Sequence, residues 1–146
     1  MGRAMSITQV GDTLEIQRLL AHYARAVDAK DWELYRSLFT ADAQIDYSSA
    51  MPGMVGARDE IVKRLSESLE PLETMMHYIT NIEVDLSGDT AQVRAMFYNP
   101  LQVPGFDQMS YCGGYYHHAM VRTEDGWRSR ELREETVWFA NPPVLE

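Results

Sequence analysis

His77 lies within the stretch TMMHYITN (residues 74–81), an apolar run that otherwise predicts a buried strand. A buried imidazole needs partners for its ring nitrogens, because an unpaired buried polar group costs roughly 1 to 3 kcal/mol. Asp28, far upstream in ARAVDAKDW, closes an apolar helical pattern and is a candidate partner. A histidine oriented by a carboxylate can act as a general base near neutral pH. The two residues together therefore predict acid-base chemistry.

Each of these residues also has a purely structural interpretation. His77 alone could be a core histidine whose nitrogens are satisfied by its neighbours. Asp28 lies at the edge of its helical stripe, and an acid in the last turn of a helix opposes the helix dipole, so it could simply be solvated. The functional interpretation depends on the two residues meeting in space.

Other residues with reactive side chains give weaker indications. His117 and His118 are adjacent on an expected strand, so they should point to opposite faces. No ligand spacing supports a metal site built from His22, His77 and one of that pair, and we expect none. Cys112 is the only cysteine, which excludes an internal disulfide and favours a buried thiol.

Length and charge restrict the class of protein. A chain of 146 residues fits one domain over 1–146, with residues 1–11 expected as a loose arm and 140–146 as a tail. A formal charge of −9 argues against nucleic acid and against anionic membrane surfaces as partners. No apolar run approaches the ~20 residues that span a bilayer, and with one cysteine the cytoplasm is the expected compartment.

Three helices are expected in the first half of the chain. Apolar residues recur at helical spacing from Asp12 onward, and Asp12 and Glu15 stand in a capping-box-like relation. A shorter helix is expected over 31–39 and a third over 57–72. A short strand over 44–49 should lie between them.

From Thr74 the hydrophobic period changes to two, which predicts an antiparallel meander. Its long strands are expected over 90–103, 110–123 and 127–140. Gly113 and Gly114 inside the second of these indicate a bend or bulge. The whole pattern predicts an α+β fold, with three N-terminal helices packed on a strongly curved antiparallel meander sheet, a cone with a pocket.

The motifs YARAVDAKDW, LFTADAQIDY, MMHYITN and GGYYHHAMVRTEDGWR, in this order of elements, resemble the SnoaL-like family of the nuclear-transport-factor-2-like superfamily. The similarity is greatest to scytalone dehydratase, hexachlorocyclohexane dehydrochlorinase and bile acid 7α-dehydratase. It implies a cone-shaped α+β barrel without metal or organic cofactor. It also implies that His77 is the base, that Asp28 orients it, and that Tyr47 helps to polarise the substrate or water. Tyr23 is a further catalytic candidate, because it lies one helical turn before Asp28 and is expected in the same pocket.

The resemblance also suggests residues that contact the substrate. A second histidine of scytalone dehydratase falls here on NPL, which begins at Asn99, so scytalone itself is not the expected substrate. Further polar contacts map near Tyr115 and His117. Trp127 is one of several aromatic residues that could line the pocket and favour a ring-shaped ligand.

The expected function is that of a cofactor-independent lyase, or a related isomerase, acting on a hydrophobic cyclic small molecule. Two alternatives stay open, because one fold hosts many functions. The first is a non-catalytic binding or assembly subunit, like the small subunit of a dioxygenase. The second is a SnoaL-type polyketide cyclase, which would use a carboxylate. A homo-oligomer, dimer or trimer, is expected through an apolar outer sheet face that carries Tyr116, Met120, Trp138 and Phe139.

Overall fold

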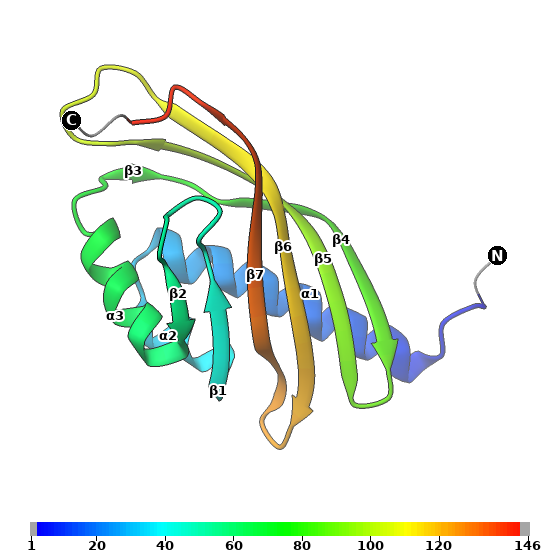
Figure 1. Cartoon of the computed structure of the whole chain (residues 1–146). Coiled ribbons are helices and arrows are strands. Elements are labelled where there is room, and N and C mark those ends of the chain that lie inside the picture. Colours follow the sequence, from blue (N-terminus) through cyan, green and yellow to red (C-terminus); the bar gives the residue numbers. More distant parts are fainter. Residues whose placement is uncertain (1–2, 144–146) are drawn as a thin grey trace.

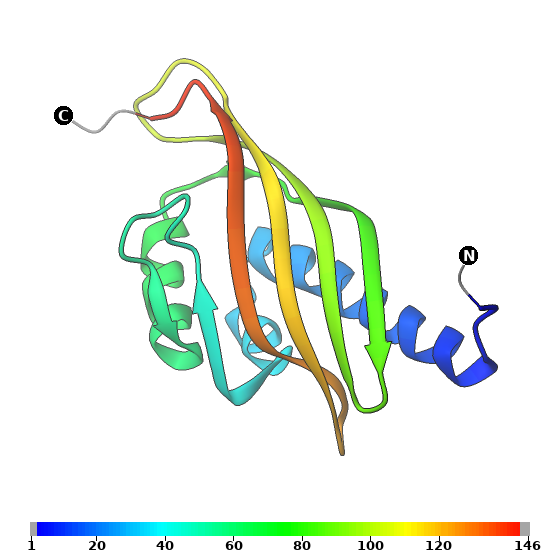
Figure 2. The same cartoon turned by 45° about the vertical axis from the view of Figure 1, so that its right-hand side comes forward.

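The helices cover one face of a strongly curved sheet, and the longest of them runs across its concave side (Figures 1 and 2). The computed structural model describes residues 3–143. In chain order the elements are α1 (Ile7–Asp28), α2 (Trp32–Ser37), β1 (Phe39–Asp46), β2 (Val55–Ala57), α3 (Arg58–Leu69), β3 (Thr74–Met75), β4 (Tyr78–Ser87), β5 (Thr90–Gln102), β6 (Ser110–Thr123) and β7 (Gly126–Ala140). This is the α+β cone that the sequence predicts.

The sheet has the strand order β2-β1-β7-β6-β5-β3, and β4 also pairs with β5. The strands from β3 to β7 form the predicted antiparallel meander. β1 lies parallel to β7, so the complete sheet is mixed and not purely antiparallel. A single core fills the space between the helices and the concave face, and Ile16, Leu20, Tyr35, Ile45 and Ile61 are fully buried within it.

The first helix begins earlier than its apolar pattern indicates. Ser6 is the N-cap: its hydroxyl accepts from the backbone N–H of Gln9 at 3.1 Å, and the Gln9 side chain accepts from the backbone N–H of Ser6 at 2.8 Å. The prediction of a loose arm over 1–11 is therefore wrong for residues 7–11, which are helical. Of the predicted tail over 140–146, Ala140 still belongs to β7, and residues 144–146 lie outside the described part of the chain.

Asp12 and Glu15, expected as a helix cap, instead tie α1 to the hairpin between β6 and β7. The Asp12 carboxylate accepts from the Arg122 guanidinium at 2.7 and 2.8 Å and from the Trp127 indole at 3.0 Å. Glu15 accepts from the backbone N–H of Trp127 at 2.8 Å. The hydrogen bond from Arg122, followed by that from Trp127, lowers the pKa of Asp12 to about 2.

The predicted irregularity at Gly113 and Gly114 is confirmed, because the register between β6 and β7 shifts there. A Cβ atom at Gly114 would collide with the backbone oxygen of Glu135, and one at Gly113 with the indole of Trp138. A second shift occurs opposite Ala119 and Met120. Each shift inserts a residue into β7 and changes which alternate side chains of that strand face the core.

No helix of residues 3–143 is long and apolar enough to cross a membrane.

Candidate active site

Asp28 is the last residue of α1, and the chain turns sharply after it. The backbone N–H of Asp31 bonds to the Ala26 carbonyl at 2.8 Å, and Lys30 takes a positive φ of 56°. Asp31 then caps α2 by accepting from the N–H of Leu34 at 3.1 Å. These two turn contacts fix the last turn of α1, and with it the position of the Asp28 carboxylate.

His77 lies between two strands and not inside one, which differs from the prediction. β3 ends at Met75 and β4 begins at Tyr78, although both pair with β5. The backbone N–H of His77 is consequently outside the sheet ladder, and it donates to Oδ2 of Asp28 at 2.9 Å. Because the edge strand is interrupted here, the Asp28 carboxylate accepts from the backbone N–H of His77 in addition to contacting its ring.

The predicted pair forms. Nδ1 of His77 lies 2.7 Å from Oδ1 of Asp28, so the two carboxylate oxygens hold both the ring and the backbone of the same residue. The side chain of His77 is 7 % exposed and that of Asp28 is 25 % exposed. Within the described chain the second ring nitrogen, Nε2, takes part in no hydrogen bond. The pair therefore leaves one nitrogen of His77 available for a ligand.

His77 forms part of the wall of a cavity of about 330 Å³ between α1, α3 and the concave face of the sheet. Most of the wall is apolar, with Val27, Leu65, Leu69, Leu72 and Phe139 among its side chains. No Lys or Arg occurs among the described residues that line it. A volume of this size with few polar groups is typical of a site for a small, largely apolar molecule.

Tyr23 and Tyr47 also line this cavity, and their hydroxyl groups are 2.5 Å apart. Tyr47 contacts a third hydroxyl, that of Tyr35, at 2.6 Å. All three side chains are buried, and burial raises the pKa of each above its ordinary value. The three hydroxyls carry three protons and use two of them in these bonds, so one O–H is left for the neighbouring Tyr116 hydroxyl or for a ligand.

Glu134 is a cavity residue that the sequence analysis missed. Its side chain lies in the cavity wall, the residue is 8 % exposed, and its Oε1 atom is buried without a hydrogen-bond partner in the described chain. Burial raises the pKa of this carboxyl to about 7. A carboxyl group in this environment is able to hold a proton near neutral pH.

Asn99 lines the cavity as predicted, and its Oδ1 atom is another buried acceptor without a partner among the described residues. Cys112 also lines it, and burial raises the pKa of this thiol to about 11, which favours the protonated thiol near neutral pH.

Tyr115 and His117 are not in the cavity. They lie on the outer face of the sheet, where the Arg94 guanidinium stacks 3.8 Å from the Tyr115 ring and Nε2 of His117 contacts Glu135 at 2.8 Å. The expectation that both contact substrate there is wrong, because their side chains alternate with the inward-facing Tyr116 and His118. His118 is buried and bonds to Ser129 at 2.8 Å, so the prediction of opposite faces is confirmed.

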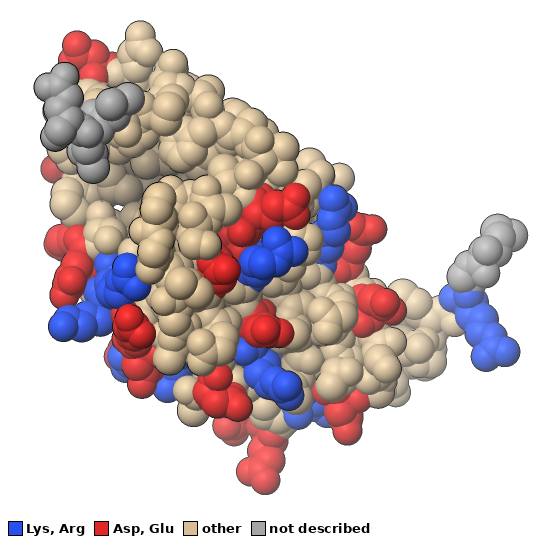
Figure 3. Space-filling view, viewed as in Figure 1, with Lys and Arg blue, Asp and Glu red and all other residues tan. Residues whose placement is uncertain are grey.

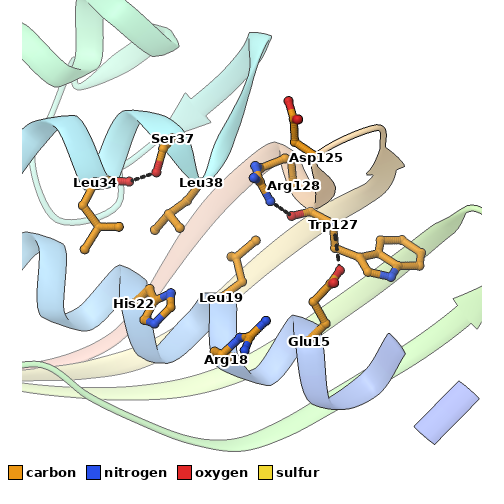
Figure 4. A pocket seen from close by; sticks show the side chains of 10 residues that line it. All are labelled: Glu15, Arg18, Leu19, His22, Leu34, Ser37, Leu38, Asp125, Trp127 and Arg128. Carbon is orange, nitrogen blue, oxygen red and sulfur yellow. Dashed lines mark hydrogen bonds between the residues drawn. The ribbon is translucent and has the colours of Figure 1, made fainter. Parts of the chain in front are cut away.

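Trp127 is also absent from this cavity and borders a different hollow of about 260 Å³ between α1, α2 and the β6–β7 hairpin (Figure 4). Glu15 and Arg128 are directed at the Trp127 backbone there, and the guanidinium donates to its carbonyl at 2.7 Å. Glu15, which belongs to α1, holds the hairpin against that helix. Trp127 therefore stabilises the fold and does not contact a ligand in the His77 cavity.

No three His, Cys, Asp or Glu side chains of residues 3–143 gather in a group that could hold a metal ion.

A curved α+β cone that encloses an apolar cavity is the nuclear-transport-factor-2-like architecture. The family follows from the sequence itself: the model of the SnoaL-like domain matches residues 8–133. The chain therefore belongs to the SnoaL-like family, as its motifs predict.

Individual proteins support this assignment. An uncharacterized protein of Mycobacterium tuberculosis H37Rv is 38 % identical over 125 residues, which cover 85 % of this chain and 84 % of the relative. The crystal structure of a candidate scytalone dehydratase from Novosphingobium aromaticivorans superposes with a TM-score of 0.86 at 21 % identity, over 97 % of this chain and 94 % of that one. A hexachlorocyclohexane dehydrochlorinase from Novosphingobium barchaimii gives a TM-score of 0.78 at 17 % identity, over 90 % of each chain. At these identities the two structures show a shared fold.

Proposed function

We propose that the protein is a cofactor-independent lyase, or a related isomerase, that acts on a hydrophobic cyclic small molecule. The observation that carries the proposal is the 2.7 Å contact between Asp28 and Nδ1 of His77 beside an apolar cavity. A carboxylate on Nδ1 selects the tautomer with a bare Nε2 and stabilises the imidazolium that forms when Nε2 takes a proton. His77 is then the base and Asp28 positions it.

The tyrosines supply the complementary donor. When Tyr35 donates to Tyr47 and Tyr47 donates to Tyr23, the remaining O–H is that of Tyr23, which lines the cavity. A neutral phenol polarises a carbonyl oxygen and makes the neighbouring C–H bond more acidic. The suitable substrate is therefore a cyclic ketone with a leaving group two carbons from the carbonyl.

The test is turnover of such ketones by two matched variants. A positioned general base contributes roughly 10² to 10⁴ in rate, so His77→Gln should lose at least a hundredfold in kcat/KM. His117→Gln removes the other carboxylate-bound histidine, on the outer face, and should keep full turnover. Full turnover by His77→Gln would refute the proposal.

A second candidate function is the SnoaL-type cyclase, which the inward-facing carboxyl of Glu134 favours. In that reaction Glu134 would be the acid-base and turnover would not depend on His77. The binding or assembly subunit is the remaining alternative, and turnover of any of these ketones that depends on His77 would exclude both.

We also propose that the protein self-associates in the cytoplasm. The outer face carries a broad uncharged area near the C-terminal end of β7 (Figure 3). Three exposed rings lie together there: the centroid of Tyr98 is 5.8 Å from that of Tyr78, which is tilted against it, and 6.1 Å from that of Trp138, on which it stacks. Tyr116, Met120 and Phe139 were also expected on this face, but the first two are buried and the third lines the cavity. Sedimentation should give a dimer or trimer, and a strict monomer would contradict this.

A further inference from the structure

We propose that Glu134 is the proton donor to an oxygen leaving group, so that the substrate is a neutral cyclic alcohol and the reaction is a dehydration. This inference rests on the proposed elimination and specifies its leaving group. It begins from the unpartnered Oε1 atom of Glu134, which is buried in the wall of the same cavity as His77.

A buried carboxyl oxygen without a hydrogen-bond partner is costly, and such groups are kept where a ligand completes their hydrogen bonds. Asn99, which also lines the cavity, has a second unpaired acceptor, its Oδ1 atom. A hydroxyl group fits this wall, because it accepts a proton from a neutral carboxyl and has a proton of its own to donate. A halogen substituent has no proton to donate.

The charge of the cavity also distinguishes water from a halide ion as the leaving group. Among the described residues that line it there is no Lys or Arg, so a departing halide ion would meet no cation there except the imidazolium formed at His77. Water leaves as a neutral molecule when the oxygen receives a proton. Burial raises the pKa of Glu134 to about 7, so a large share of this carboxyl carries the required proton at neutral pH.

The step balances as follows. Nε2 of His77 takes the proton from the carbon beside the carbinol carbon, and the electrons of that C–H bond form the double bond. The C–O bond breaks, the oxygen takes the proton of Glu134, and water leaves. The cavity then holds an imidazolium and a carboxylate, and transfer of one proton from His77 to Glu134 through water restores both groups.

The first experiment measures binding and needs no turnover. The probes are 2-tetralol and tetralin, which differ in one hydroxyl, and their dissociation constants are measured by protein NMR. The wild-type chain should bind 2-tetralol at least tenfold more tightly, because a site built to bond a hydroxyl rejects the analogue without it. Glu134→Leu should abolish this preference. Glu135→Gln, a change at the neighbouring residue on the outer face, should preserve it. Equal binding of both probes, or binding of neither, would overturn the inference.

The second experiment measures turnover of 3-hydroxycyclohexanone and 3-chlorocyclohexanone. Glu134→Gln should lower kcat/KM for the hydroxy ketone at least a hundredfold and leave any chloro ketone turnover within a few fold. In the wild type the rate on the hydroxy ketone should fall as the pH rises through about 7, since Glu134 then loses its proton. Turnover of the hydroxy ketone that needs His77 but not Glu134 would refute this inference and keep the proposed function. A preference for 2-tetralol without any turnover would keep Glu134 as a hydroxyl-binding residue, but would refute its donor role together with the proposed elimination.

Discussion

Two histidine–carboxylate pairs lie on opposite faces of the sheet, with almost equal distances between the ring nitrogen and the carboxylate oxygen. His77 and Asp28 meet at 2.7 Å beside the cavity, and His117 and Glu135 meet at 2.8 Å on the outer face. The side chains of the first pair are 7 % and 25 % exposed, and those of the second are 27 % and 46 % exposed. The distance between the partners therefore does not identify a site. What differs is the surroundings of the remaining ring nitrogen.

The carboxylates in the two pairs also differ in how they are held. Asp28 accepts from both the ring and the backbone of His77, because the break between β3 and β4 releases that backbone N–H. Glu135 contacts only a ring, and its neighbours Arg94 and Arg133 are charged surface residues. An exposed ion pair of this kind contributes little to stability. The comparison predicts that changes to the inner pair alter function and that the same changes to the outer pair do not.

The largest expected effect comes from removing the charge of each carboxylate in turn. Asp28→Asn should lower kcat/KM by at least about 10², because the amide no longer selects the productive tautomer or stabilises the imidazolium. Glu135→Gln should stay within twofold of the wild type in the same steady-state assay. Equal losses in the two variants would remove the distinction between the pairs.

The next effect concerns stability and follows from the buried carboxyl of Glu134. The folded chain holds the Glu134 proton up to a pH of about 7, whereas the unfolded chain releases it near 4.5, so this group lowers the free energy of unfolding as the pH rises between these values. Glu134→Gln should therefore change that free energy little at low pH and raise it by roughly 3 kcal/mol at pH 8. Denaturant unfolding at both pH values measures it. If the free energies of unfolding of Glu134→Gln and the wild type differed by the same amount at both pH values, Glu134 would not be a buried carboxyl with a raised pKa.

A smaller effect is expected from the tyrosine network. Tyr35→Phe removes one hydroxyl from Tyr47 without altering the cavity wall, since Tyr35 does not line it. Loss of one hydrogen bond of about 1 kcal/mol should lower kcat/KM roughly fivefold. Tyr115→Phe, on the outer face, is the matched control and should have no effect. A variant of Tyr35 with full activity would exclude a proton-donating role for the chain of hydroxyls.

The smallest effect is that of the outer pair on folding. His117→Gln and Glu135→Gln should each leave the melting temperature within about 2 °C of the wild type, because both side chains are partly solvated. Calorimetry measures it. A large decrease would mean that the outer pair holds the sheet together.

The fold and the inner pair were predictable from sequence because their indications are local. Helical and strand periods predicted the three helices, β1 and the meander, but neither the short strand β2 nor the break between β3 and β4. His77 and Asp28 stand out as polar residues in apolar patterns. The bulge at Gly113 and Gly114 was predictable for the same reason. The capping motif at Ser6 was overlooked, since its turn precedes the apolar stripe.

Glu134 was not predictable because its orientation depends on an inserted residue. In β7 the buried positions are Trp127 and Ser129 before the register shift and Leu132 and Glu134 after it. If buried and exposed side chains alternated without interruption from Trp127, Glu134 would point into solvent. Its charged neighbours in the sequence favour the same orientation. Tertiary pairing with β6 reverses that orientation, and no pattern within β7 alone reports it.

The most direct test of the central claim is the tautomer of each histidine, read from the ¹⁵N shifts of both imidazoles at pH 8. We expect His77 to carry its proton on Nδ1, where Asp28 binds it, and to have a bare Nε2 whose ¹⁵N shift changes when 2-tetralol is added. His117 provides the internal reference, with its proton on Nε2 and no response to the ligand. A proton on Nε2 of His77, or an Nε2 that ignores the ligand, would contradict the assignment of His77 as the base.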